Sequence, residues 1–161
     1  MLATAPLGDH SSAGRHLVLD TLRYLQVHGD SSGGRAVGEE LLDRWREVLG
    51  PDHPDTLTVG SGLTFALVFA GETEPARALG RNTLQRCRRI LGPDHPTTLL
   101  AAAGLTLALV QREAEAARDL GQDTLERGRR MFGPDHATTL WAAAALTAAL
   151  VRGGLRRRPA R

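Results

Sequence analysis

The chain has 161 residues, the length of one ordinary domain, and its 42% hydrophobic and 24% charged residues are typical of a globular protein. All 20 basic residues are arginine, which excludes lysine-dependent chemistry such as that of P-loop ATPases and Schiff-base enzymes. An aromatic fraction of 4% and a single isoleucine argue against an all-β fold, whose pleated faces need such side chains. The net charge of +2 is uneven, because residues 152–161 hold five arginines and no acid.

No segment is predicted to enter or cross a membrane. The first ten residues lack the basic and apolar regions of a secretory signal. The longest uncharged apolar stretch, 137–151, has 15 residues, whereas a bilayer span needs roughly 20. The single cysteine, Cys87, cannot form an intramolecular disulfide, which fits a reducing compartment. We therefore expect a cytoplasmic protein without a membrane partner.

A short segment recurs along the chain and defines a repeat of 41 or 42 residues. It occurs as Leu49-Gly-Pro-Asp-His53, Leu91-Gly-Pro-Asp-His95 and Phe132-Gly-Pro-Asp-His136, with a degenerate copy at Leu7-Gly8-Asp9-His10. This spacing predicts a repeat domain over 7–152, with three full repeats at 7–48, 49–90 and 91–131 and a half repeat at 132–152. A flexible basic tail is expected at 153–161.

Each full repeat is predicted to form two helices. In chain order, helices are expected at 11–28, 34–48, 54–70, 73–90, 96–111, 113–131 and 137–152. In the recurring segment, glycine supplies a left-handed residue that ends one helix, proline prevents its continuation, and Asp or His can cap the next. The loop Ser31-Ser-Gly-Gly34 is interpreted as a flexible turn. Because such hairpins cannot bury a core alone, they must stack into an all-α solenoid of about seven helices.

The repeat resembles the 42-residue tetratricopeptide repeat (TPR) of kinesin light chains, a type that is also common in actinobacterial proteins. The resemblance rests on Leu-Gly-Pro-Asp-His-Pro-x-Thr-Leu at 49–57 and 91–99, and on Leu63, Leu67, Gly71 and Ala76. It implies a right-handed superhelix whose first helices line a concave groove for a peptide or a partner helix. The asparagine pair typical of the family is absent, which weakens the expectation of an extended peptide. Its places hold Ser61-Gly62, Ala103-Gly104 and Ala144-Ala145.

The concave positions of the family, projected onto this chain, give a mostly apolar groove. The residues expected to line it are His16, Leu19, Arg23, Phe65, Phe69, Leu100, Leu107, Gln111 and Trp141. Each apolar member also has a core interpretation, because a leucine at helical spacing is often a packing residue. Phe65 and Phe69 favour the groove, since the core positions Leu63 and Leu67 are already apolar. An apolar groove favours a helix as the bound partner.

The last predicted helix carries no charged residue between Ala137 and Val151. A terminal helix of a solenoid needs a polar outer side, whereas a helix that is apolar all round is expected to be buried. We therefore expect this helix to pack against a second copy in a two-fold homodimer. The residues assigned to this contact are Leu140, Trp141, Ala145, Leu146 and Leu150. The other interpretation is an alanine-rich face that is tolerated in water.

The side chains that invite a chemical interpretation have structural explanations. His53, His95 and His136 occupy equivalent points of repeats whose helices stand roughly 8–10 Å apart, too far to share one zinc ion. We expect them to cap helices, and Cys87 to be a structural thiol. With no catalytic motif, metal site or cofactor predicted, the chain is interpreted as a non-catalytic module that binds a protein or peptide. The alternative is an accessory or catalytic protein that binds a hydrophobic small molecule, and nucleic acid is expected only at the arginine tail.

Overall fold

The computed structural model describes residues 31–156, which form six α-helices and no strand. In chain order they are α2 (Ser31–Val48), α3 (Pro54–Phe69), α4 (Thr73–Ile90), α5 (Pro96–Leu109), α6 (Ala114–Phe132) and α7 (Ala137–Arg156). They match the predicted helices from 34–48 onward. The helix predicted at 11–28 and residues 157–161 of the predicted tail lie outside the described residues. The all-α solenoid is confirmed.

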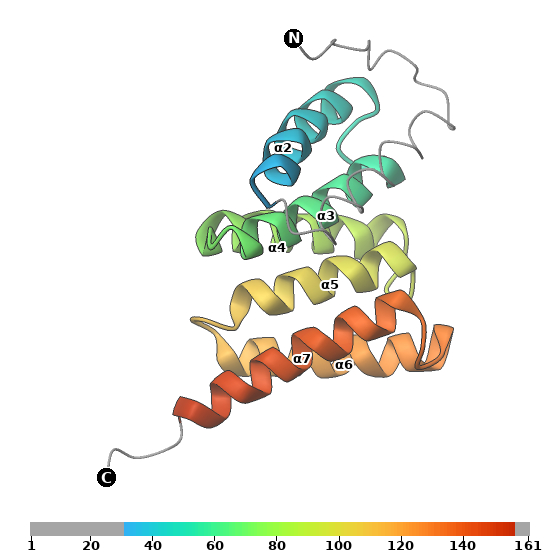
Figure 1. Ribbon diagram of the computed structural model, residues 1–161. Helices are drawn as coiled ribbons and strands as arrows, with labels where there is room; N and C mark the ends of the chain where they lie inside the picture. The colour runs from blue at the N-terminus through green and yellow to red at the C-terminus, as the bar shows by residue number, and fades with distance from the viewer. Residues whose placement is uncertain (1–30, 157–161) are drawn as a thin grey trace.

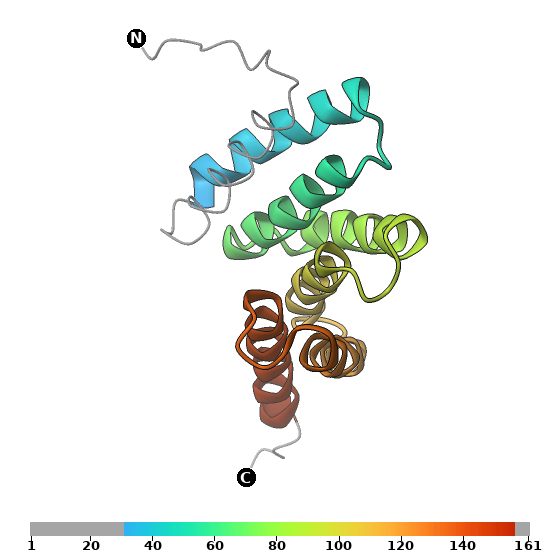
Figure 2. The same ribbon diagram turned by 90° about the vertical axis from the view of Figure 1, so that its right-hand side faces the viewer.

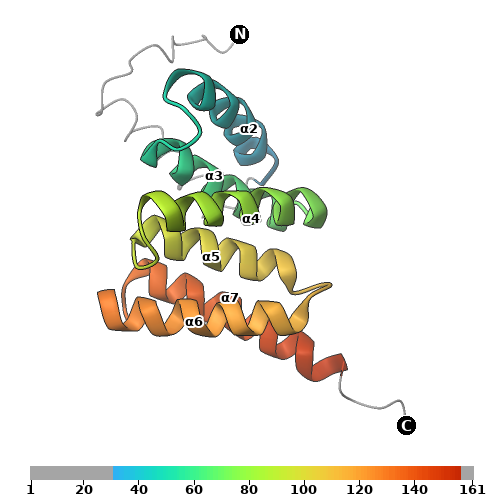
Figure 3. The same ribbon diagram turned by 180° about the vertical axis from the view of Figure 1, so that it is seen from behind.

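The helices stack in chain order in two layers. Figure 1 shows α3, α5 and α7 nearest the viewer, and Figure 3, from behind, shows α4 and α6 in front. We call the first set the front layer and the second the rear layer. Helix α5 contacts α3 and α7 within the front layer and α4 and α6 behind it, whereas α4 and α6 do not contact each other. Each hairpin thus buries its apolar surface on its neighbours.

The recurring turns have the predicted chemistry. Their glycines have positive φ angles of 93°, 89° and 85° at Gly50, Gly92 and Gly133. In each turn the histidine Nδ1 accepts a hydrogen bond from the backbone N–H two residues later. These bonds are 3.1 Å at His53, 3.2 Å at His95 and 3.2 Å at His136. The capping role of the three histidines is therefore confirmed.

Small residues let the two layers approach closely. A Cβ atom added at Gly80 of α4 would lie 3.1 Å from Thr64 Cγ2 of α3, and one added at Gly121 of α6 would lie 3.1 Å from Thr106 Cγ2 of α5. Around these contacts Leu63 and Leu67 are buried, as predicted, and so are their counterparts in α5, Leu105 and Leu109. Helices α3 and α5 can be apolar on nearly all sides because neighbours cover them from both layers.

Two predicted boundaries are wrong. Helix α2 begins at Ser31, so the segment interpreted as a turn forms its first helical turn. Helix α7 continues to Arg156, so Gly153 and Gly154 do not end it, and the first four residues of the predicted tail are helical. A glycine costs a helix about 1 kcal/mol but keeps its N–H donor, so the hydrogen-bond ladder can continue through it. In this part of the chain no helix is long and apolar enough to span a bilayer.

Candidate functional site

Three aromatic rings from α3 and α7 form a cluster in the front layer. The ring centroid of Phe65 lies 5.0 Å from that of Trp141 and 6.3 Å from that of Phe69, and Phe69 lies 6.4 Å from Trp141. These separations fall in the range of attractive aromatic pairs. Because α5 lies between α3 and α7, whose backbones do not contact each other, the rings join two helices across a third.

Phe65 was predicted to line a groove, and this prediction is wrong because its side chain is only 3% exposed. The reason lies in the next repeat, at Gly104 of α5. A Cβ atom at Gly104 would approach Phe65 Cε2 to 3.2 Å, so the ring occupies space that any larger residue would fill. Trp141 then covers the ring from α7. Phe65 is therefore a core residue that supports the other two rings.

Four of the remaining predicted residues form a partly exposed apolar surface. Phe69, at the end of α3, is 50% exposed. Leu100, Leu107 and Trp141 are partly buried and pack together against Phe65 and its neighbours. We call Phe69, Leu100, Leu107 and Trp141 the aromatic surface. Gln111 is exposed beyond the end of α5, where it accepts a hydrogen bond from Arg152. His16, Leu19 and Arg23 lie outside the described residues.

Helix α7 has a second exposed apolar surface. Leu140, Leu150 and Val151 are 55%, 52% and 59% exposed. With three smaller exposed residues they follow one side of the helix at spacings of three or four. We call this surface the open face; it consists of Ala137, Leu140, Ala144, Thr147, Leu150 and Val151.

The open face contains only two of the residues assigned to self-association, Leu140 and Leu150. Trp141 and Leu146 are partly buried within the chain. Ala145 is fully buried beside Phe65 and Ala103, so its assignment to an exposed contact is wrong. Ala145 occupies the position of Gly104 in the preceding repeat, on the side of the helix that faces back along the stack.

Internal helices bury the positions that α7 exposes. In α5, the equivalents of Leu140, Ala144, Thr147 and Val151 are Leu99, Ala103, Thr106 and Val110, which are 2%, 0%, 0% and 8% exposed. The following helices α6 and α7 cover these residues, and the described part of the chain offers no helix that does so for α7. Sequence reasoning did not assign Ala144, Thr147 and Val151 to self-association, although their equivalents in α5 are buried.

An ion-pair cluster links each of the first two recurring turns to the second helix of its own repeat. Asp52 contacts Arg86 at 2.6 Å and Arg89 at 2.8 Å. The hydrogen bond from Arg86 lowers the pKa of the Asp52 carboxyl below its usual range. The equivalent Asp94 contacts Arg127 and Arg130, at 2.9 and 3.5 Å.

The third equivalent aspartate, Asp135, precedes α7. The helix that would bring the matching arginine pair is not among the described elements. Asp135 is exposed, and no ion pair with an arginine reaches it from the described residues. The start of α7 therefore presents a carboxylate where the two earlier repeats neutralise theirs.

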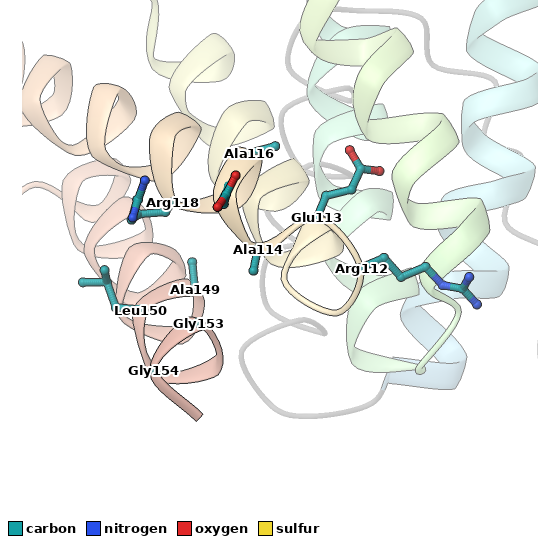
Figure 4. Close-up of a pocket in the computed structure, with 10 residues that line it drawn as sticks. Arg112, Glu113, Ala114, Ala116, Arg118, Ala149, Leu150, Gly153 and Gly154 are labelled. Carbon is teal, nitrogen blue, oxygen red and sulfur yellow. The ribbon is translucent and has the colours of Figure 1, made fainter. Parts of the chain in front are cut away.

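A pocket of about 580 Å³ opens between the start of α6 and the end of α7. Figure 4 shows Arg118 of α6 on the side of Leu150 of α7, whereas the side chains of Arg112 and Glu113, before α6, point away from α7. Leu150 belongs to both the pocket and the open face. The pocket is thus a recess at the C-terminal edge of that face, with charges of both signs around it.

The thiol of Cys87 is buried and does not belong to any of these surfaces. Cys87 is 0% exposed, and burial raises the pKa of its thiol to about 11. This fits the structural role predicted for it. No group of three or more His, Cys, Asp or Glu side chains in the described helices and turns is arranged to hold a metal ion.

Comparison with known proteins agrees with the repeat period. A family model described as tetratricopeptide repeat matches residues 23–55, 56–97 and 104–138. Each match ends two residues after a capping histidine, at His53, His95 and His136. No curated protein matches the chain. The period found from the Gly-Pro-Asp-His turns is therefore the period of the family.

Proposed function

The chain belongs to the tetratricopeptide repeat family, whose repeats cover more than half of its length, and from this premise we propose that it binds a partner helix on its aromatic surface. Repeats of this family support a role in protein–protein interaction and are generally non-catalytic. The bound partner is then a protein or peptide, and the chain is a scaffold or accessory module rather than an enzyme. Its single, buried cysteine is consistent with a cytoplasmic location.

The exposure of Phe69 carries this proposal. Half of its side chain faces solvent although it packs on Trp141, so a large apolar anchor is presented on a rigid support. Exposed aromatic residues of this kind mark interaction sites more often than isolated aliphatic ones do. An amphipathic helix with apolar residues at three- and four-residue spacing is the ligand that suits an apolar surface on packed helices.

Binding of a hydrophobic small molecule is the less favoured alternative. It would need a closed cavity around the two phenylalanines. Instead, Phe65 fills the space over Gly104, and the three rings contact one another. For nucleic acid, the arginine tail remains the only proposed contact, and most of it lies outside the described residues.

A matched pair of variants tests the aromatic surface. Helical peptides that bind the full chain are selected from a library, and their dissociation constants are measured by calorimetry against Phe69→Glu and Ile90→Glu. Ile90 is 45% exposed at the end of α4 in the rear layer, so it controls for adding a charge to an exposed apolar site. We expect Phe69→Glu to weaken binding at least about tenfold and Ile90→Glu to leave it unchanged. Equal affinities for the two variants would refute the assignment.

We further propose that the chain self-associates through α7 as a homodimer. The exposed Leu140 and Leu150 support this, because large apolar side chains exposed together on one side of a helix favour a contact with another protein surface. Light scattering over a concentration series that reaches about 1 mM should show the mass rising from the monomer value of 17.3 kDa toward twice that value. A constant monomer mass throughout the series would contradict it.

A further inference from the structure

We propose that a second copy of the chain lays its own α7 antiparallel on the open face, with Leu140 opposite the partner's Val151 and Ala144 opposite the partner's Thr147. This inference rests on the proposed self-association and specifies its geometry. In this arrangement the partner's α7 packs on α7 in the way that α4 packs on α3 and α6 packs on α5. Three features of α7 support it: the spacing of its exposed residues, the size of the central ones, and the charges at its ends.

The exposed residues have a spacing that suits a pair of helices. Ala137, Leu140, Ala144, Thr147 and Val151 alternate steps of three and four residues, which keeps one stripe facing a neighbouring helix over several turns. The stripe is also nearly symmetric about its midpoint between Ala144 and Thr147. An antiparallel partner therefore places the same residue types at both ends, as a two-fold axis requires.

The central residues are small, as they are where the layers of this protein meet. The rear-layer helices bury a small residue and a threonine three positions later against the front layer, Gly80 with Thr83 in α4 and Gly121 with Thr124 in α6. Helix α7 exposes Ala144 and Thr147 with that same spacing. Its centre can therefore be approached closely, while the larger Leu140 and Val151 pack on either side.

The direction of the second helix follows from charge. In the earlier repeats, arginines of the second helix neutralise the aspartate of the turn, whereas Asp135 has no such partner among the described residues. In the antiparallel register, the partner's Arg152 lies about four residues, or about 6 Å along the axis, from Asp135. An arginine side chain spans that distance. A parallel pair would instead bring the two Asp135 residues together at one end and the two Arg152 residues together at the other.

The two ends of the open face are accessible for this contact. Asp135 and Arg152 are both exposed, and Arg152 donates a hydrogen bond to the exposed Gln111. Figure 2 shows α7 beside α6 at the C-terminal end of the stack, with no described helix beyond them.

Disulfide trapping tests the register in the full chain. Leu140→Cys and Val151→Cys are prepared as separate proteins, and Cys87 stays in place because it is buried. In the proposed pair, residue 140 lies opposite residue 151 of the partner. Two copies of residue 140 are eleven positions apart, about 16 Å along the axis, beyond the roughly 7 Å that a disulfide allows between Cα atoms. Mild oxidation should therefore crosslink the mixture of the two variants and neither variant alone.

Each other outcome overturns the proposal in a recognisable way. If each variant crosslinks with itself, the helices are parallel. If light scattering shows a dimer that the mixture does not crosslink, self-association stands and the register is wrong. A monomer at every concentration refutes both, and it leaves the aromatic surface to its separate test with Phe69→Glu.

Charge reversal provides a second measurement. Asp135→Arg and Arg152→Asp should each weaken the dimer about tenfold, because each removes two symmetric attractions and adds repulsion. The double variant restores the pairing in reversed order and should recover the dissociation constant to within about threefold. Additive losses in the double variant would show that these two residues do not meet.

Discussion

Replacement of Phe65 by alanine should destabilise the protein far more than the same replacement at Phe69. Phe65 is 3% exposed and fills the space over Gly104, so its removal leaves a cavity and uncovers Trp141. Such large-to-small changes cost about 3–5 kcal/mol. Phe69 is 50% exposed, so its removal gives up only part of the transfer free energy of a ring, about 1 kcal/mol.

Urea unfolding followed by far-UV circular dichroism measures both free energies of unfolding. In a domain of this size, the Phe65→Ala loss should lower Tm by roughly 10 °C, and the Phe69→Ala loss by about 3 °C. Phe65→Leu, which keeps most of the volume, should cost less than about 1.5 kcal/mol and keeps the test possible if the alanine variant does not fold. Similar costs for Phe65→Ala and Phe69→Ala would refute the assignment of one ring to the core and the other to the surface.

Three further substitutions or measurements test other contacts. Asp52→Asn should lower Tm at neutral pH. Because the pKa of Asp52 is lowered in the folded state, the carboxylate stabilises the protein fully at pH values above about 3.8, and this effect is lost as the pH falls through the folded-state pKa. A Tm difference between the two proteins that persisted at lower pH would contradict this. Gly121→Ala should lower the free energy of unfolding in urea by about 1–3 kcal/mol, because the added Cβ would lie 3.3 Å from the backbone Cα of Leu146. The control Gly153→Ala has nothing within 4 Å of the added Cβ and should raise the free energy of unfolding by about 0.5–1 kcal/mol. Cys87 should resist alkylation at pH near 8 until urea unfolds the chain, since a pKa of about 11 leaves about 0.1% thiolate; rapid labelling of the native protein would show that the thiol is accessible.

The turns could be predicted from the sequence because their chemistry is local. A glycine with positive φ, a proline and a histidine cap act within a few residues. Gly-Pro-Asp-His also occurs three times, so the same turn could be recognised at three places in the chain. The helix boundaries outside these turns were predicted less accurately. Helix α2 starts three residues before the predicted position, and α7 runs four residues past Arg152, because glycine weakens a helix without ending it.

The site could be predicted only in part because burial depends on contacts between repeats. Phe65 and Phe69 are four residues apart on one helix and have the same side chain, and the difference in their exposure comes from Gly104 in the following repeat. The ion pairs of Asp52 and Asp94 have the same origin. Their arginines lie 34 and 33 residues away, and only the folded hairpin brings them to the turn.

The same limit explains why α7 can resemble a buried helix and still be exposed. Leu99 and Leu140 occupy equivalent positions and have identical side chains, yet they are 2% and 55% exposed, because among the described elements only α5, which carries Leu99, is covered by later helices. Covering the half-exposed Leu140, Leu150 and Val151 would contribute about 1 kcal/mol each, or about 6 kcal/mol for two copies. Association itself costs at least about 4 kcal/mol. The apolar contact alone therefore leaves about 2 kcal/mol, which corresponds to a dissociation constant of tens of millimolar. The two symmetric Asp135–Arg152 attractions are needed to bring the dissociation constant of the proposed dimer into the millimolar range. In such a weak pair, the charges of Asp135 and Arg152 decide both the direction of the helices and whether the dimer is populated, so its dissociation constant should rise with salt concentration. A dissociation constant that does not change with salt would assign the whole contact to the apolar stripe.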